Sequence, residues 1–372
     1  MIINGDSTEE LKNLLVLDDN LTALKNTPAE SIDLIYLDPP FFSGRDYNVI
    51  WGDKGEVRSF SDRWGDGSEK TGLEIYIAWM EERVREMHRV LKPTGSFYLH
   101  CDWHASHYLK VLCDRVFGYG NFRNEIVWKR TNSPKAQSKT YGAQHDVILL
   151  YSKTDVCVFN SVSRRVEESE EIPAHYNQRD EKGLFCTVAL VAGGVQKSTG
   201  RKSFVFKGID AQWLYSKENL EKIEAQGLLY ETNTGGLRMK RYWDGKATLS
   251  TLWVDSEVAP LQGSGKEGVG YPTQKPLALL ERIIKASSNP GDIVLDPFCG
   301  GGTTLVAAAK NNRHYIGIDE SVAAIRVSQE RLKDHQGMFE DKYPVVLGLP
   351  HAFDDFNALR SRNPRAVPDE HQ

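Results

Sequence analysis

Two short motifs constrain what this chain can fold into more than any other feature, because each comes directly after a run of strand-forming residues. The first is Asp38-Pro39-Pro40-Phe41, after the apolar run 32–37, and the second is Asp296-Pro297-Phe298-Cys299-Gly300-Gly301-Gly302-Thr303-Thr304, after 293–295. Strand patterns alternate along the chain with helical patterns, which predicts an α/β protein whose parallel sheet has helices on both faces. Ligands bind at the carboxyl ends of strands in such sheets, so both motifs are expected at a binding edge.

The periodicity of apolar residues predicts the individual elements. One helix is expected at 73–91, because six apolar residues share one face there: Leu73, Ile77, Met80, Val84, Met87 and Leu91. The following Lys92-Pro93-Thr94-Gly95 predicts where that helix stops. Further helices are predicted at 277–288 and 305–310, and strands at 31–37, 96–100, 125–128, 146–151, 293–295 and 314–318.

The regular alternation fades in the middle of the chain, which indicates an inserted domain. We therefore predict one part of the α/β domain at 1–153, a small inserted domain at 154–266, a second part of the α/β domain at 267–335 and a C-terminal extension at 336–372. The insert mixes cations with aromatic residues, as in Arg238-Met239-Lys240-Arg241-Tyr242-Trp243. Such a mixture is typical of a surface that contacts nucleic acid, and also of a buried strand pair with basic edges.

The charge of the chain excludes a generic nucleic-acid coat protein, because the formal net charge is -5. An enzyme that acts on DNA needs only a local basic cleft. The segment 123–165 has eight basic and three acidic residues, a local charge of +5 by 8 - 3; a solvated basic face is the alternative interpretation. The candidate DNA contacts are Lys129, Arg130, Lys135, Arg238, Lys240 and Arg241.

The remaining bulk features predict a cytoplasmic protein without a membrane segment. No run of about 18 apolar residues occurs, and the first residues lack the pattern of a signal peptide. The five cysteines form no C-x-x-C pair, so neither a disulfide framework nor a zinc knuckle is indicated. His100, His104 and His107 lie near one another, but the first would end a strand and the others would open a helix, so no metal site is predicted.

The glycine-rich motif suggests a turn that lets backbone approach a cofactor. Gly300, Gly301 and Gly302 have no Cβ atoms to obstruct such an approach. The next predicted strand ends in Asp319, an acid placed to accept both ribose hydroxyls of an adenosine-type cofactor. The G-x-G-x-x-G pattern of dinucleotide enzymes is absent, since Thr304-Leu305 stands where its third glycine would fall. An ordinary strand-to-helix loop is the alternative.

The Asp-Pro-Pro-Phe motif suggests a pocket for an amino group on a flat ring. The Asp38 carboxylate and the Pro39 carbonyl can accept the two N–H bonds of an exocyclic amine, and proline stiffens the turn between them. Phe41 offers an apolar face on which a base can stack. A plain turn after a strand is the alternative.

Together the two motifs resemble those of amino-group DNA methyltransferases, and their order along the chain resembles the β class of that family. The resemblance implies a Rossmann-like class I methyltransferase sheet, seven-stranded, mixed and cyclically permuted, with an inserted target-recognition domain. It also implies S-adenosylmethionine as cofactor. The resemblance implies that a segment covering the methionine end of the cofactor is Tyr271-Pro272-Thr273-Gln274-Lys275-Pro276-Leu277. It also implies that a strand-end acid in Asn4-Gly5-Asp6 approaches the adenine of the cofactor. The family usually has tyrosine at the position of Phe41, so stacking is retained and a hydroxyl contact is lost.

The resemblance assigns roles to particular positions. Catalysis is expected at Asp38, Pro39, Pro40 and Phe41, and cofactor binding at Asp6, Lys275, Pro276, Asp296, Pro297, Phe298, Gly300, Gly302, Thr303 and Asp319. The predicted activity is methyl transfer to a flipped base in double-stranded DNA, at N6 of adenine because the motif begins with Asp. N4 of cytosine, an RNA or protein amine, and a non-catalytic DNA-binding regulator are the alternatives. A homodimer and a separate restriction endonuclease are partners that the class allows, without support from any particular residue.

Overall fold

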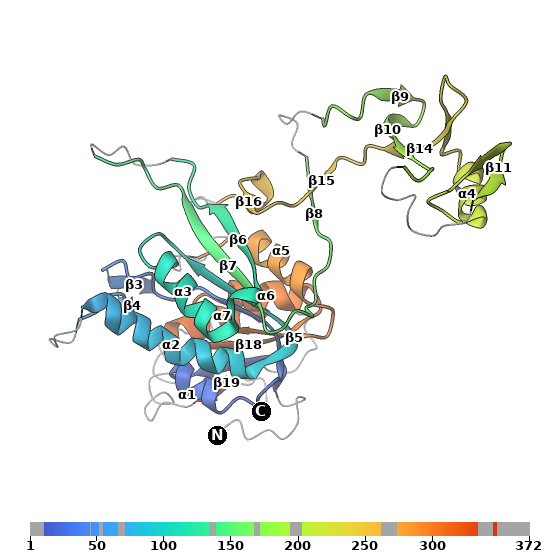
Figure 1. Ribbon diagram of the computed structural model, residues 1–372. Helices are drawn as coiled ribbons and strands as arrows, with labels where there is room; N and C mark the ends of the chain where they lie inside the picture. Colours follow the sequence, from blue (N-terminus) through green and yellow to red (C-terminus); the bar gives the residue numbers. More distant parts are fainter. Residues whose placement is uncertain are drawn as a thin grey trace, which may run out of the picture. The chain divides into compact units, whose positions relative to one another are not determined.

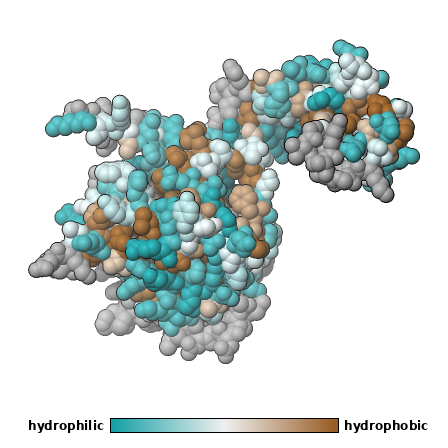
Figure 2. Space-filling view, viewed as in Figure 1, coloured by the Kyte–Doolittle hydropathy of each residue, from teal (hydrophilic) through white to brown (hydrophobic). Residues whose placement is uncertain are grey.

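The computed structural model describes residues 11–44, 46–51, 55–65, 71–133, 139–166, 172–193, 203–261, 274–333 and 345–347. The chain forms two compact units (Figure 1), one from 1–162 and 249–372 and the other from Ser163–Thr248. The face in Figure 2 is mostly hydrophilic with smaller hydrophobic groups between, as expected when most apolar side chains pack into internal cores. Among the described helices, none combines the length and apolarity that a membrane crossing requires.

The first unit is built on one large mixed sheet. Its strand order is β16-β6-β7-β5-β2-β17-β18-β1-β19, in which β7 alone runs antiparallel to both of its neighbours. The strands are β1 (Leu14–Leu17), β2 (Ile32–Leu37), β5 (Leu91–Cys101), β6 (Phe122–Lys129), β7 (His145–Ser152), β16 (Leu252–Trp253), β17 (Ile293–Asp296), β18 (His314–Asp319) and β19 (Val345–Leu347).

The predicted seven strands are therefore extended to nine among the described residues. The two additions are short edge strands, β16 with two residues and β19 with three. Each pairs in parallel with one strand of the inner seven, β16 with β6 and β19 with β1. A strand this short has too little periodicity to be recognised in a sequence, and it exists only because a neighbour offers unpaired backbone groups. The α/β class and the mixed sheet agree with the prediction.

Alternating side chains of the inner strands supply two separate cores. In β2, Ile35 and Leu37 face one core, whereas Leu34 and Tyr36 face the other, because successive side chains point to opposite faces of a strand. One core is covered by α1 (Asn20–Lys25), α2 (Gly72–Val90) and α3 (Ser106–Phe117), and the other by α5 (Leu277–Ser287), α6 (Thr303–Lys310) and α7 (Val322–Lys333).

The helix predicted at 73–91 is α2, which starts with a capping box. The Thr71 side chain accepts from the Glu74 backbone, and the Glu74 side chain accepts from the Thr71 backbone. The helix ends just before 92–95, as predicted, since its last residue is Val90. Residues 92–95 are not a turn but the start of β5, where the pairing with β2 is irregular. A bulged strand start tolerates Pro93 and Gly95, which are common in turns for the same conformational reasons.

The Asp38–Phe41 motif is followed by a hairpin of β3 (Asp46–Trp51) and β4 (Gly55–Ser61). The second unit has a four-stranded sheet of order β13-β14-β10-β9, which packs through β13 and β14 on the helix α4 (Lys217–Ala225). Its strands are β8 (Ser163–Arg165), β9 (Gln178–Asp180), β10 (Gly183–Ala189), β11 (Phe204–Phe206), β12 (Ile209–Ala211), β13 (Leu229–Glu231), β14 (Leu237–Tyr242) and β15 (Lys246–Thr248). This unit lies inside the predicted insert, 154–266.

Candidate active site

A cavity of about 390 Å³ lies at the carboxyl ends of β2, β17, β18 and β1, four adjacent strands that run parallel. Its volume is within the usual range of small-molecule sites. Both motifs predicted to share a binding edge line it, so residues more than 250 positions apart in the chain meet here: Asp38, Pro39, Pro40, Phe41, Lys275, Asp296, Pro297, Phe298, Gly300, Thr303 and Asp319. Of the predicted cofactor residues, Pro276 and Gly302 are described but do not line it.

Asp38 stands immediately after β2, and its two carboxylate oxygens have different surroundings. Oδ2 accepts a short hydrogen bond from the Lys275 ammonium group, which also lies 5.3 Å from the centroid of the Phe41 ring. Oδ1 is buried and has no hydrogen-bond partner among the described residues. An aspartate oxygen that is desolvated and unpaired is costly to the folded protein, and it is therefore an acceptor ready for a donor from a ligand.

One face of the Phe41 ring packs against the buried side chain of His100. Its ring stacks on His100 at 5.9 Å between centroids, with 25° between the planes. The Tyr36 hydroxyl contacts His100 Nδ1 at 2.9 Å, and Asp146 Oδ2 contacts Nε2 at 3.2 Å. A proton on Nε2 lets the imidazole donate to Asp146. Burial disfavours the charged Asp146, but the hydrogen bond and charge of His100, with Lys275 and Arg130, hold its pKa below the usual range.

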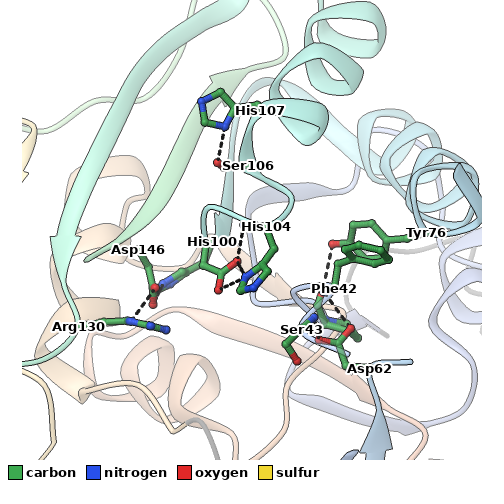
Figure 3. A network of polar contacts seen from close by, with 12 residues as sticks. Phe42, Ser43, Asp62, Tyr76, His100, His104, Ser106, His107, Arg130 and Asp146 are labelled. Atoms are coloured by element: carbon green, nitrogen blue, oxygen red, sulfur yellow. Dashed lines mark hydrogen bonds and ion pairs between the residues drawn. The ribbon is translucent and has the colours of Figure 1, made fainter. Parts of the chain in front are cut away.

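The three histidines do not converge. His104 is held by Asp102, and His107 contacts Ser106 (Figure 3). Across the described residues there is no group of three or more side chains that could hold a metal ion. His100 thus contributes to the site as a support for Phe41, a role that the spacing of the histidines does not reveal.

The glycine turn is held by side chains from α7. Gly302 has φ 73°, and a Cβ there would lie 2.5 Å from Ser328 Oγ, so only glycine fits this position without a shift. Ser328 donates from Oγ to the Gly300 carbonyl, and Arg331 donates to the Gly301 carbonyl. These contacts fix the turn against the cavity floor, and neither residue was recognised from sequence because both lie one strand and one loop beyond the motif.

Two carboxyl groups flank the turn, Asp296 buried and Asp319 half-buried. The Asp319 oxygens accept from the backbone of Gly300 at 2.9 Å and Ser321 at 2.8 Å, and those of Asp296 accept from Thr304 Oγ1 at 2.5 Å and the Phe298 backbone at 3.0 Å. Burial raises the pKa of Asp296 to about 7 and that of Asp319 to about 6, although these hydrogen bonds act in the opposite direction. Each oxygen still has lone pairs that can accept from a ligand.

An aromatic wall that the sequence analysis missed closes another side. Trp64 and Trp79 line the cavity, with 5.0 Å between their ring centroids, and Trp79 lies 5.8 Å from Phe298. Arg83 stacks on Trp79 at 3.7 Å. Its Nε donates to Asn20, whose amide in turn donates to the Pro297 carbonyl. The helical spacing of 79 and 83 was readable, but nothing local indicated that they would face the cofactor motif.

The prediction for the strand-end acid near the start of the chain is not tested by the described residues. Asp6 lies outside the described residues. The acid that lines the cavity after a described strand is Asp18, which follows β1, and burial raises its pKa. β1 pairs with β18 in parallel and brings Asp18 to the same edge as Asp319.

The predicted DNA contacts are distributed over both units. Lys129 ends β6, Arg130 lies 3.5 Å from Asp146, and Lys135 is outside the described residues. In β14, Arg238 donates to Thr187, and Lys240 is paired with Asp180 at 2.7 Å, which leaves Arg241 as the exposed cation of the three.

The structure joins the features that the resemblance to amino-group DNA methyltransferases predicts: a mixed α/β sheet, a glycine turn, a strand-end acid and an adjoining Asp-Pro-Pro-Phe turn. A family model described as DNA methylase matches residues 32–330. The chain therefore belongs to this family of N6 and N4 amino methyltransferases, which confirms the predicted resemblance, and it is an S-adenosylmethionine-dependent DNA methyltransferase.

Two related proteins and one solved structure are similar to most of this chain. The type II methyltransferase M.EcaI of Enterobacter cloacae is 30% identical over 332 residues, 88% of this chain and 70% of that protein. The DNA adenine methyltransferase YhdJ of Escherichia coli K12 is 27% identical over 326 residues, 86% of this chain and 82% of that protein. A solved structure of a DNA modification methylase from Thermus thermophilus with S-adenosyl-L-methionine is 18% identical, covers 91% of this chain and 100% of that chain, and has a TM-score of 0.48.

Proposed function

We propose that this enzyme methylates N6 of adenine within a short recognition site of double-stranded DNA, and that the target base leaves the helix to reach the cavity. The observation that carries the proposal is the buried Asp38 Oδ1, which has no hydrogen-bond partner among the described residues. It lies beside Phe41, whose ring is supported by His100. An acceptor next to a supported aromatic face suits a flat ring that carries an amino group.

The chemistry asked of the protein is modest. The lone pair of an exocyclic amine is delocalised into the ring, so Asp38 Oδ1 and the Pro39 carbonyl accept its two N–H bonds and favour a more tetrahedral nitrogen. Bound S-adenosylmethionine supplies a sulfonium methyl group, so that the N–C bond forms as the C–S bond breaks. The proton then in excess on the amine leaves towards Asp38. Positioning and electrostatics supply the catalysis.

The residues around the cavity fit the cofactor. Asp319 would accept the ribose hydroxyls, because both of its oxygens keep free lone pairs at the end of β18. Gly300 and Gly301 line the cavity and present no side chain to the cofactor, and Asp18, which also lines it, would contact the adenine. Asp296 and Phe298 complete the wall.

Lys275 contacts the Asp38 motif as well as lining the cavity. The resemblance assigned it to the methionine end of the cofactor, whereas its ammonium group is bound to Asp38 Oδ2. We infer that it keeps this carboxylate in one orientation, with Oδ1 directed to the base, while the side chain remains part of the cavity wall.

The insert predicted at 154–266 is assigned to recognition of the DNA sequence. Supporting this, Ser163–Thr248 forms its own compact unit, and Arg241 in β14 is exposed. Lys129 and Arg130, in the other unit, would meet phosphates, which position DNA without reading its sequence. A homodimer, a separate restriction endonuclease and a cytoplasmic location complete the proposal; the last is favoured because DNA and cofactor are both available there.

The target base is the finer part of the proposal. Adenine is favoured by the leading aspartate of the motif and by the adenine methyltransferase YhdJ among the relatives. Cytosine N4 methylation would use the same acceptors, and the experiment below separates the two.

The test is single-molecule sequencing of DNA from a methylation-free host that expresses the enzyme. We expect N6-methyladenine in one short motif, its loss in Asp38→Ala, and its retention in Asp155→Ala, a matched control at an exposed aspartate. Methylated cytosine would correct the base. Labelled RNA with unmodified DNA, from purified enzyme and cofactor, would overturn the substrate.

A further inference from the structure

The chain reverses direction immediately after the catalytic motif, at a residue with an unfavourable backbone conformation. Phe42 has φ 63°, in the left-handed region that residues other than glycine rarely adopt. Such a conformation persists only where surrounding contacts hold it, and it is found preferentially at functional sites. The neighbouring residue is Phe41, on which the target base is expected to stack.

The contacts that hold this turn come from Asp62, which is fully buried. Its Oδ1 accepts from the Phe42 backbone at 2.9 Å, and its Oδ2 accepts from the Ser43 backbone at 2.6 Å (Figure 3). Its own carbonyl accepts from Gly44 at 3.0 Å. Two successive backbone N–H groups that point to one carboxylate are the arrangement that a left-handed residue permits.

A second anchor holds the motif from the other side. The Tyr76 hydroxyl donates to the Pro40 carbonyl at 2.8 Å, and the Tyr76 ring lies 5.8 Å from that of Phe42. The backbone on either side of Phe41 is therefore fixed independently, by Tyr76 before it and by Asp62 after it. The remaining freedom of the Phe41 ring is limited by its contact with His100.

Asp62 also reaches the cavity wall. Its Oδ1 accepts from Trp64 Nε1 at 2.9 Å, and Trp64 lines the cavity together with Trp79. One carboxylate thus joins the turn behind the catalytic motif to the aromatic wall of the cofactor cavity.

We propose that Asp62 is a positioning residue for methyl transfer, acting by holding Phe42 in the left-handed conformation and so keeping Pro39 and Phe41 in place for the target base. This inference rests on the proposed role of the Asp38 motif. It predicts that the requirement for Asp62 disappears when residue 42 can adopt a positive φ without help.

The experiment therefore uses two backgrounds at position 42. Asp62→Asn keeps the size of the side chain and the acceptor for Phe42 and Trp64, but places an NH₂ group against the Ser43 backbone donor. We expect it to lower kcat about tenfold, since small misplacements at a reacting centre have effects of that order. In the Phe42→Gly background the same change should lower kcat by less than about threefold, because glycine adopts positive φ readily.

Phe42→Ala is the matched control, because it removes the same ring from Tyr76 but keeps the Cβ that disfavours positive φ. Asp62→Asn in the Phe42→Ala background should again lower kcat about tenfold. Equal losses of kcat in the glycine and alanine backgrounds, or no loss in any background, would overturn the positioning role. If Asp62→Asn alone is not obtained folded, the two double variants still decide the matter. Wild-type enzyme without methylation, or an active Asp38→Ala, would instead count against the proposed function.

Discussion

Replacement of Asp296 by asparagine should stabilise the cofactor-free protein at neutral and alkaline pH but much less at acid pH. Asp296 is only 3% exposed, and its burial raises the pKa of the carboxyl group from 3.8 to about 7. Thr304 and the Phe298 backbone donate to it. In asparagine the side-chain oxygen can accept from the Phe298 N–H, and the NH₂ group can donate to the Thr304 hydroxyl, which then becomes the acceptor.

The sign follows from the proton counts of the two states. Between pH values near the unfolded pKa and about 7, the folded protein binds the Asp296 proton and the unfolded chain has released it. The free energy of unfolding therefore falls as pH rises through this window and is level above it. The interval from pH 5 to the folded pKa of about 7 is about two pH units. At about 1.4 kcal/mol for each unit, the free energy of unfolding of the wild-type protein should fall by roughly 3 kcal/mol across it.

The assay is urea unfolding of both proteins at pH 5, 6, 7 and 8 without cofactor, since groups common to both proteins cancel in the difference. The advantage of Asp296→Asn should grow by roughly 3 kcal/mol between pH 5 and pH 8. Asp155→Asn, at an exposed site, should show a difference independent of pH. A constant difference for Asp296→Asn across this range would refute the reasoning that burial controls this carboxyl group.

Three further predictions follow from the same contacts. The pKa of Asp319 is raised to about 6, so the affinity for S-adenosylmethionine, measured by calorimetry, should fall about tenfold for each pH unit below 6. Asp319→Asn should bind the cofactor weakly, with an affinity that depends less on pH. The same pH dependence in Asp319→Asn would count against this role of Asp319. Lys275→Met leaves the Asp38 carboxylate without its cation, so it should lower the free energy of unfolding in urea by about 3 kcal/mol and abolish methylation. Lys275→Arg should retain part of the stability and part of the activity. Wild-type stability of Lys275→Met would contradict this. Gly302→Ala places a Cβ against Ser328, so it should lower the free energy of unfolding by more than the roughly 1–2 kcal/mol that a positive φ costs alone. Gly245→Ala measures that backbone cost by itself, because Gly245 has the same φ of 73° and a Cβ there would meet nothing within 4 Å. Equal losses of stability in the two variants would show that the contact with Ser328 is unimportant.

The elements that could be predicted are those in which a local pattern and a tertiary environment agree. The helix 73–91 was recognised because its apolar residues repeat at the helical period, and α2 spans Gly72–Val90. The strands that lead to Asp38 and Asp296 were recognised because they are mostly buried on both faces and so are mostly apolar. The edge strands β16 and β19 carry no such signal, because pairing with a neighbour defines them.

By itself, the sequence determined the family, the cofactor and the residues of the two motifs, since these depend on short runs whose chemistry is independent of the rest of the chain. Only the tertiary structure decided how the motifs are supported. It placed Lys275 on Asp38 across 237 positions, His100 against Phe41, Asp62 behind the turn that follows Phe41, and Asp18 at the cavity. Contacts of this kind join distant segments through the folded sheet, and neither periodicity nor turn chemistry encodes which distant partner will arrive there.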